Sequence, residues 1–313
     1  MIVAAFLSHR TIRRSLQCLQ AQSLPPFEIV VCDSSPDERT VREIEAHASE
    51  AKARGDEIEE SPVFRLIRSE ERLLPQEARA RGVEASRGEL LLFTDPDVYA
   101  EPEWLERLIA LHRRRRPAVV GGAIACWDRD WLNRGIHICK FARWLPGGRV
   151  RAVDNVPTAC LLIARDLYDE LGGFDDPYFG DAQLSRAAAA HGEVLLEPAA
   201  IAHHDHAMTF RGFLRERYRR GLRAGDEAEG RAARMAARLV VTLLPLRLLH
   251  TFYVSMLDCL RGPGIGTWTR ALPILLIGQG ASMAGEARGM IARLLNRRTS
   301  RPPRARATRS PSS

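Results

Sequence analysis

The sequence has no closely spaced cysteine pair and almost no lysine. Its six cysteines are scattered along 313 residues, and none belongs to a CxxC pair. A chain of this length can bury a sizeable core without a disulfide framework, so the pattern predicts reduced thiols in a cytosolic protein. Only Lys52 and Lys140 are lysines, so nearly all of the positive charge is carried by arginine.

The folded body of the chain has no excess of positive charge. Eight arginines lie between Arg288 and Arg309, and no acidic residue follows Glu286. This tail carries +8, whereas the whole chain carries +7, so the remainder is at −1. The pI of about 9.4 by itself would suggest a nucleic-acid partner. A neutral body without a basic aromatic face disfavours that function, and we expect no nucleic-acid binding.

The sequence also lacks an uninterrupted apolar run that could cross a membrane. The segment Leu239 to Leu260 has the required length but contains polar and helix-breaking residues, namely Pro245, Arg247, His250 and Asp258. On a helix its polar residues share one side, which predicts an amphipathic helix lying in the headgroup layer. Together with the arginine tail, it predicts association with an anionic membrane surface. The alternative is a soluble helical region that packs on the rest of the chain or forms a dimer.

Strand and helix patterns alternate through the first two thirds of the chain. Short apolar runs predict strands at 2–7, 27–32, 64–67, 90–93, 119–123, 158–164 and 194–196. We interpret the first run as a strand rather than a signal peptide, because it is short and lacks a basic start. Helical patterns between the runs predict a Rossmann-like α/β fold, with a mostly parallel central sheet and helices on both faces. The pattern is blurred over 128–154, which predicts a loop-rich insertion.

Two carboxylates, Asp95 and Asp97, follow the apolar run Leu90 to Phe93 directly. Ligands of open α/β sheets bind at the carboxyl ends of strands, where these side chains would lie. Their spacing lets them share a divalent cation, and Mg²⁺ typically combines one or two carboxylates with substrate phosphates. The segment therefore predicts a site for a nucleoside-diphosphate substrate. A solvated Asp-Pro-Asp turn is the alternative.

The order of motifs along the chain resembles glycosyltransferase family 2, a group of nucleotide-sugar-dependent enzymes with the GT-A fold. The resemblance covers Ile2 to about Gly221. Its segments are Val30-Val31-Cys32-Asp33, Ala78-Arg79-Ala80-Arg81-Gly82 (similar to the family's ARNxG), Asp95-x-Asp97 (its DxD), Gly172-Gly173-Phe174-Asp175, Asp181 and His203-His204-Asp205-His206. The resemblance implies the GT-A fold and a nucleoside-diphosphate sugar as donor.

The resemblance also assigns roles to individual residues. It implies donor contacts by Ser8, Asp33, Arg79 and Asp95. It implies a metal site made by Asp95, Asp97 and His204, with His203 as a rival to His204. A histidine ligand suits Mn²⁺ better than Mg²⁺, and either ion is a candidate cofactor. The alternatives are a helix-capping role for Asp33, a solvated helix charge for Arg79 and surface positions for the histidines.

Asp181 is the residue that the resemblance makes the catalytic base. Family members usually carry a Glu-Asp pair here, whereas this chain has Gly180-Asp181. The carboxylate would accept the proton of the acceptor hydroxyl as the sugar is transferred with inversion. Because Asp181 precedes a predicted helix, a capping role is the alternative.

These patterns predict an inverting, metal-dependent glycosyltransferase with a glycan or lipid-linked acceptor, active in surface polysaccharide or glycolipid synthesis. We expect a GT-A catalytic domain at 1–210, a helical membrane-associated or packing region at 211–298 and a disordered basic tail at 299–313. The expected location is the cytoplasmic face of the plasma membrane, and the oligomeric state stays open. Ala80 and Gly180 leave a non-catalytic nucleotide-sugar-binding scaffold as an alternative. A nucleotidyltransferase is less favoured, because residues 8–11 are not a glycine-rich phosphate loop.

Overall fold

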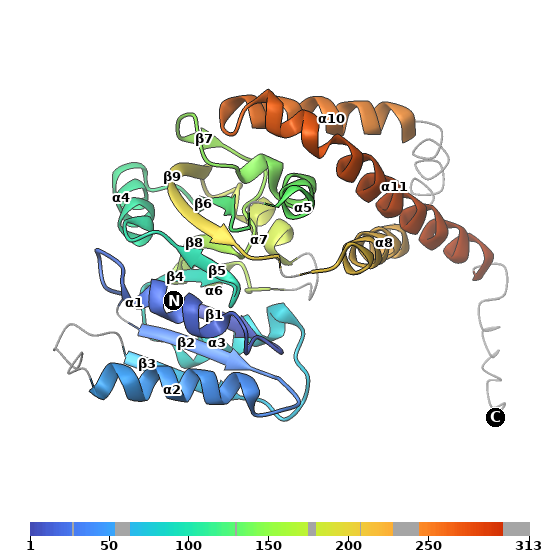
Figure 1. Cartoon of the computed structure of the whole chain (residues 1–313). Coiled ribbons are helices and arrows are strands. Elements are labelled where there is room, and N and C mark those ends of the chain that lie inside the picture. Colours follow the sequence, from blue (N-terminus) through green and yellow to red (C-terminus); the bar gives the residue numbers. More distant parts are fainter. Residues whose placement is uncertain are drawn as a thin grey trace, which may run out of the picture. The chain divides into compact units, whose positions relative to one another are not determined.

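The computed structural model describes residues 1–26, 28–53, 63–128, 130–174, 180–206, 208–227 and 244–296. The chain divides into two compact units, which we describe separately (Figure 1). The first consists of Met1–Ala207 with Ser255–Ala271, and the second of Met208–Val254 with Leu272–Ser313. The predicted disordered tail, 299–313, lies outside the described residues.

The described strands of the first unit form one sheet. Its order is β3-β2-β1-β4-β8-β6-β9-β5, and β7 pairs with β9 beside this path. The strands are β1 (Ile2–Ala5), β2 (Glu28–Asp33), β3 (Val63–Arg68), β4 (Leu90–Thr94), β5 (Val98–Ala100), β6 (Val119–Cys126), β7 (Arg151–Ala152), β8 (Cys160–Ala164) and β9 (Val194–His204).

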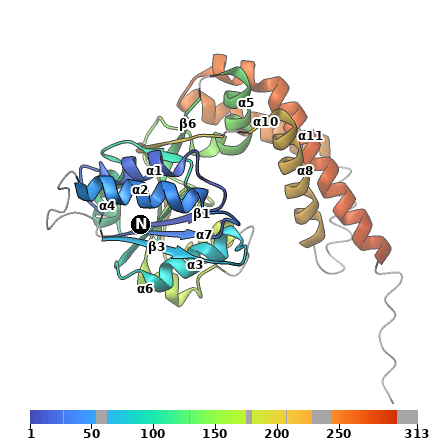
Figure 2. The same cartoon turned by 60° about the horizontal axis from the view of Figure 1, so that its bottom comes forward.

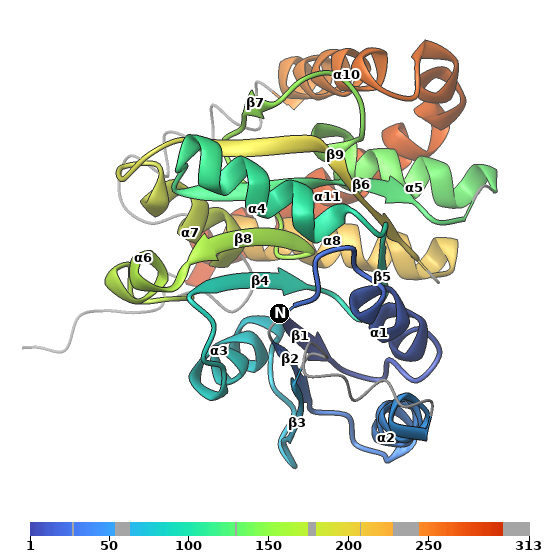
Figure 3. The same ribbon diagram turned by 90° about the vertical axis from the view of Figure 1, so that its left-hand side faces the viewer.

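The sheet is mixed, so the prediction of a mostly parallel sheet is wrong for its second half. Strands β3, β2, β1 and β4 are parallel to one another, as are β6 and β9. Strand β8 runs antiparallel to both β4 and β6, and Figure 3 shows it beside β4. Strands β5 and β7 are antiparallel to β9. An apolar run predicts a buried strand but does not carry its direction, which is why the sequence did not reveal this reversal.

Helices cover both faces of the sheet, as predicted. In the first unit they are α1 (Ile12–Gln20), α2 (Arg39–Ala53), α3 (Pro75–Ala85), α4 (Trp104–Arg115), α5 (Trp131–Phe141), α6 (Arg165–Glu170) and α7 (Gly180–Ala188). Figure 2 shows α1 and α2 on one side of the sheet and α3 and α6 on the other.

Two apolar cores result from the alternation of side chains along each strand. In β1, Val3 packs with Leu16 of α1 and Leu108 of α4, all of them fully buried. The neighbouring Ile2 belongs to the opposite core, with Tyr168 of α6. A strand covered on both faces needs apolar residues at successive positions, which accounts for the continuous apolar runs in the sequence.

The predicted loop-rich insertion at 128–154 is instead largely structured. Its main element is α5, followed by a 3₁₀ turn at Ala142–Trp144 and the short strand β7. Asp130 caps α5, because its carboxylate accepts a hydrogen bond from the Asn133 amide at 2.9 Å. Polar His137 is buried on the same helix as Ile136, so the buried positions do not follow an apolar pattern.

The second unit contains α8 (Phe210–Glu227) and most of α10 (Leu244–Arg261) and α11 (Ile265–Asn296). Glycines bring two of these helices into close backbone contact. A Cβ on Gly221 of α8 would lie 1.8 Å from the Ser282 carbonyl oxygen of α11, and one on Gly285 would lie 2.0 Å from that of Tyr218. Among the described helices, none combines the length and the apolar character that crossing a membrane requires.

Candidate functional site

The segment Asp95-Pro96-Asp97, the acidic loop, forms a tight turn between β4 and β5. The Val98 amide donates a hydrogen bond to the Asp95 carbonyl oxygen at 3.2 Å and closes the turn. Thr94, at the end of β4, is fully buried, and its hydroxyl donates to the Ala159 carbonyl oxygen at 3.1 Å. The loop is therefore held at both ends, which fixes the two carboxylates at the edge of the sheet.

Pairing between β5 and β9 brings His204 to the same loop. Strand β5, which was not predicted, places Val98 opposite His204. The His204 Nε2 atom lies 3.9 Å from Asp97 Oδ1, and the Asp205 amide donates to the Asp97 carbonyl oxygen at 2.8 Å. His203 instead contacts Glu101, at 3.1 Å. Neighbouring residues of a strand point to opposite faces, and the register therefore selects His204 over His203.

Asp95, Asp97 and His204 fit a divalent cation. One candidate ligand atom of each residue lies within 4.8 Å of those of the other two. Burial raises the pKa of Asp97, an effect that the nearby His204 opposes. His204 is 7% exposed, and its Nδ1 has no hydrogen-bond partner among the described residues. Two carboxylates and an imidazole are ligands that Mn²⁺ and Mg²⁺ accept, with the imidazole favouring Mn²⁺.

Arg79, predicted as a donor contact, forms an ion pair with Asp95. Its guanidinium also donates to the Gln76 side-chain oxygen at 3.2 Å, and the residue is only 4% exposed. Buried arginine is rare unless it is paired, so the contact excludes the alternative of a solvated helix charge. Gln76 was missed in the sequence, although it lies three residues before Arg79 on the same helix, where the two side chains meet.

The start of α7, which carries Asp181, lies against Gln76. A Cβ on Gly180 would lie 3.3 Å from Gln76 Cγ and 3.2 Å from Phe174 Cδ1. Both contacts are tight, so a glutamate at this position would require its neighbours to move. Asp181 is half-buried in the first turn of α7, and its Oδ1 accepts a hydrogen bond from the Ala182 amide at 2.8 Å. Asp175 of the Gly-Gly-Phe-Asp motif lies outside the described residues.

Asp33 ends β2 at the same edge of the sheet as the acidic loop. Strand β1 is parallel to both β2 and β4, which aligns their carboxyl ends. Asp33 is fully buried, and its Oδ1 accepts a hydrogen bond from the Ser35 hydroxyl at 2.7 Å. Its Oδ2 has no hydrogen-bond partner among the described residues. Burial raises the pKa of this carboxyl group despite the hydrogen bond from Ser35.

Ser8 organises the loop that follows β1. Its amide donates to the Thr40 hydroxyl at 3.0 Å, and its hydroxyl donates to the Phe6 carbonyl oxygen at 3.2 Å. Its own carbonyl oxygen accepts hydrogen bonds from the amides of Thr11 and Ile12, where α1 begins. The described contacts of Ser8 are thus with the loop and helices around β1, and none joins it to the acidic loop.

The first half of the sequence matches a known protein family. The model for glycosyl transferase family 2 matches residues 1–163. The chain belongs to this family. The match runs from β1 into β8 and includes Asp33, Arg79, Asp95 and Asp97. It ends before Asp181 and the histidines, whose roles stay predictions.

A curated relative is similar over a shorter segment. The glucosyl-dolichyl phosphate glucuronosyltransferase of Haloferax volcanii is 30% identical over 107 residues. The matched segment covers 31% of this chain and 33% of the relative, so about a third of each protein is compared.

Two solved structures resemble this chain in fold. A mannosyltransferase of Pyrobaculum calidifontis in complex with GDP-Man and Mn²⁺ has a TM-score of 0.55 and 18% identity, covering 94% of this chain and 85% of the other. The S. aureus protein TarS 1-349 in complex with UDP has a TM-score of 0.50 and 13% identity, covering 94% and 90%. These similarities confirm the GT-A α/β fold with its mixed sheet.

Proposed function

We propose that this chain transfers a sugar, with inversion, from a nucleoside-diphosphate donor to a hydroxyl of a glycan or lipid-linked acceptor. The observation that carries the proposal is the convergence of Asp95, Asp97 and His204 at the sheet edge. The membership of glycosyl transferase family 2 supports it, as does the fold shared with a mannosyltransferase whose structure contains GDP-Man and Mn²⁺.

The donor would lie along the carboxyl ends of β1, β2 and β4. Asp33, at the end of β2, offers a buried carboxylate with an unpartnered oxygen to the nucleoside. Asp95, Asp97 and His204 would hold Mn²⁺ or Mg²⁺, which supplies positive charge to the diphosphate leaving group. Arg79 keeps the Asp95 carboxylate in place through their ion pair. Arg79 is thus a positioning residue in this proposal.

Asp181 would act as the general base. An acceptor hydroxyl is a weak nucleophile while it keeps its proton, and a carboxylate within hydrogen-bonding distance can take that proton as the new bond forms. The oxygen attacks the anomeric carbon from the face opposite the diphosphate. One bond forms as the other breaks, so the configuration inverts and no covalent sugar–enzyme intermediate is needed. Gly180 lies close to Gln76, and Gln76 is hydrogen-bonded to Arg79. This proximity supports a position of Asp181 near the donor.

A membrane-bound acceptor is the second element of the proposal. Within α10 the side chains of Leu246, Leu249 and Tyr253 are each more than half exposed. Such a face, followed in sequence by an arginine-rich tail, suits peripheral binding to anionic lipid on the cytoplasmic side of the plasma membrane. The H. volcanii relative, whose name includes dolichyl phosphate, is consistent with a lipid-linked acceptor. Surface polysaccharide or glycolipid synthesis is the process that these features favour.

The test is a donor screen with the full-length chain. Nucleotide sugars with different bases and sugars are incubated with Mn²⁺ and membrane-extracted acceptors, and nucleoside diphosphate release and sugar incorporation are measured. The proposal expects release from a narrow set of donors, and a product whose anomeric configuration by NMR is opposite to the donor's. Binding of a donor without any turnover would favour the scaffold alternative instead.

A further inference from the structure

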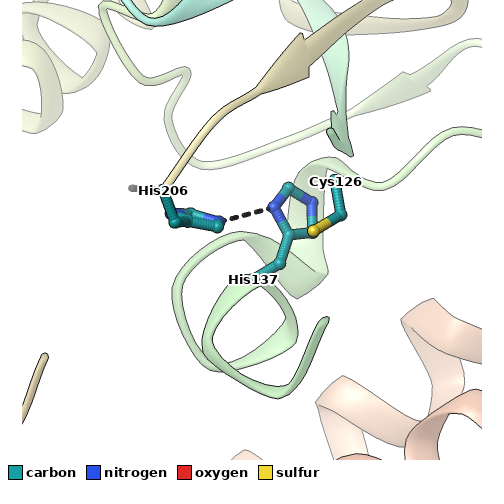
Figure 4. Close-up of side chains that lie close together, drawn as sticks. All are labelled: Cys126, His137 and His206. Carbon is teal, nitrogen blue, oxygen red and sulfur yellow. Dashed lines mark hydrogen bonds between the residues drawn. The ribbon is translucent and has the colours of Figure 1, made fainter. Parts of the chain in front are cut away.

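A second group of metal-binding side chains lies beside the acidic loop and plays no part in the proposed transfer. It consists of Cys126 at the end of β6, His137 on α5 and His206 just after β9 (Figure 4). One candidate ligand atom of each lies within 4.8 Å of those of the other two. Strands β6 and β9 pair so that Cys126 lies opposite His204, which brings the residues following β9 to the end of β6.

The tautomer of His137 is fixed by its surroundings. Its Nε2 lies 3.0 Å from the Ile124 carbonyl oxygen, which can only accept a hydrogen bond, so Nε2 must carry the proton. The lone pair is therefore on Nδ1, which faces His206 Nε2 at 2.9 Å. Metal-binding histidines characteristically donate their second ring N–H to a carbonyl or carboxylate in this way. Burial also lowers the pKa of His137, to about 3, and keeps the imidazole neutral.

His206 carries an unpartnered polar atom. The residue is 5% exposed, and its Nδ1 has no hydrogen-bond partner among the described residues. A hydrogen bond from His206 Nε2 to His137 satisfies one ring nitrogen but leaves the other buried and unpaired, which is costly. An ion bound through Nε2 would leave the proton on Nδ1, so this second nitrogen needs a further partner such as a buried water.

Cys126 is the third residue of the cluster and is more exposed than the two histidines. The residue is half-buried, and its thiol donates to the Asp128 carbonyl oxygen at 3.0 Å. Cys126 and His137 both line a cavity of about 500 Å³, whose other walls include Arg134, Leu145 and Arg261. All of these residues belong to the first unit. A fourth ligand, such as water, can thus reach an ion at this cluster from the cavity.

We propose that Cys126, His137 and His206 bind a divalent ion of the Zn²⁺ class, with a fourth position open to the cavity. A thiolate with two imidazoles is a donor set that selects Zn²⁺ over Mn²⁺ or Mg²⁺. At Zn–N distances of about 2.0–2.1 Å, tetrahedral geometry separates two ligand nitrogens by about 3.3 Å. The two rings, now 2.9 Å apart at their facing nitrogens, would separate only slightly. On binding, the Cys126 sulfur exchanges its proton for the metal, and that proton leaves to solvent.

The two metal sites would be neighbours with different chemistry. The rings of His204 and His206 stack with centroids 4.6 Å apart. His204 faces Asp97 and the hard, oxygen-rich site, whereas His206 faces His137 and the sulfur. The inference does not depend on the proposed sugar transfer, because it concerns a separate set of ligands.

The test is metal binding by the full-length, chelator-treated protein. Titration with Co²⁺, a spectroscopic substitute for Zn²⁺, should produce a thiolate-to-cobalt charge-transfer band and intense visible bands of tetrahedral cobalt at one equivalent. Zn²⁺ should displace the Co²⁺ and abolish both the charge-transfer band and the visible bands. Cys126→Ser should lose the charge-transfer band, and His137→Asn should weaken Zn²⁺ affinity at least tenfold.

Matched variants keep the result interpretable. Cys18→Ser removes a half-buried thiol outside the cluster and should leave the band intact. Cys126→His exchanges the sulfur for a nitrogen, so tight Zn²⁺ binding should persist while the band disappears. Asp97→Asn should keep the thiolate-to-cobalt band, because that band arises from Cys126 and not from the acidic loop. The proposal is overturned if wild type shows no such band, if the band survives in Cys126→Ser, or if Asp97→Asn abolishes it, since that result would mean one shared site.

Discussion

Arg79 forms an ion pair with Asp95 of the acidic loop, and the arginine is almost completely buried. A cationic group thus holds a carboxylate that is also expected to bind a cation. The guanidinium is also hydrogen-bonded to Gln76, and Gln76 lies so close to Gly180 at the start of α7 that an added Cβ would be 3.3 Å from its Cγ. This series of contacts links Asp95, a predicted metal ligand, to α7, which carries the predicted base Asp181.

Replacing Arg79 by lysine tests the positioning role. Lysine keeps the charge but loses the planar fork that reaches Asp95 and Gln76 together. We expect the affinity for nucleoside diphosphate in the presence of Mn²⁺ to fall about tenfold, as for one lost charge-assisted hydrogen bond of about 1.5 kcal/mol. Isothermal titration calorimetry measures the change. The control is Arg81→Lys on the same helix, where an exposed arginine donates to the Ser69 hydroxyl. Equal effects of the two substitutions would contradict the assigned role.

Asp181→Asn separates chemistry from donor binding. The amide cannot accept the proton of the acceptor hydroxyl, so we expect turnover to fall about 10²–10⁴-fold, the usual contribution of a general base. Donor affinity should change little, because the side chain meets the acceptor. Steady-state kinetics and donor titration give the two values, and Asp169→Asn, an exposed carboxylate on α6, is the control. A parallel loss of donor binding and turnover would argue against a base.

Asp33→Asn should stabilise the donor-free protein at neutral pH while weakening nucleotide binding. Burial raises the folded-state pKa of Asp33 above its unfolded value of about 3.9. The folded state therefore keeps the proton longer, and stability falls as the pH rises between the two pKa values. Asparagine removes this penalty. Each kcal/mol gained raises the melting temperature by about 2–4 °C, and the gain should shrink toward low pH.

The control for Asp33 is Asp37→Asn. Asp37 is only partly buried, and hydrogen bonds from Arg39 lower its pKa, so the variant should gain no stability at neutral pH. Thermal melts across a pH series distinguish the two residues. A destabilised Asp33→Asn protein at neutral pH would show that favourable contacts of the carboxylate, such as the hydrogen bond from Ser35, outweigh the cost of burying it.

Membrane association depends on the exposed apolar side chains of α10. Replacing Leu246 and Leu249 by glutamate removes two of the most exposed leucines and adds negative charge. Co-sedimentation with vesicles containing phosphatidylserine should fall at least tenfold, and wild-type binding should weaken as salt increases. Leu246→Ala with Leu249→Ala should give an intermediate loss. Wild-type protein that stays in the supernatant at low salt would exclude this localisation.

The sequence predicted those features that depend on local pattern. The run before Asp95 is apolar because β4 is buried on both faces, and its end therefore identified the acidic loop. Family membership and the GT-A fold were predicted from the order of such motifs. The antiparallel direction of β8 could not be predicted, because it depends on the path that the chain takes between α5 and β8.

Other features of the site depend on how distant segments pair in the fold, which a local sequence pattern does not show. His203 and His204 are equivalent in sequence, and only the pairing of β5 with β9 turns His204 toward Asp97. Helix α5 was missed because His137 is buried for its polar contacts rather than for apolar packing. The cluster of Cys126, His137 and His206 was also missed, because its members lie on β6, on α5 and just after β9, far apart in the sequence.

The central claim is that Asp95, Asp97 and His204 bind a cation that in turn binds the donor's diphosphate. Calorimetric titration of a nucleoside diphosphate, with and without Mn²⁺, tests it most directly in wild type and Asp97→Asn. We predict that Mn²⁺ strengthens nucleotide binding by at least tenfold in wild type and has almost no effect in the variant. Nucleotide affinity that is the same with and without Mn²⁺ in wild type, or equally enhanced in Asp97→Asn, would contradict the account.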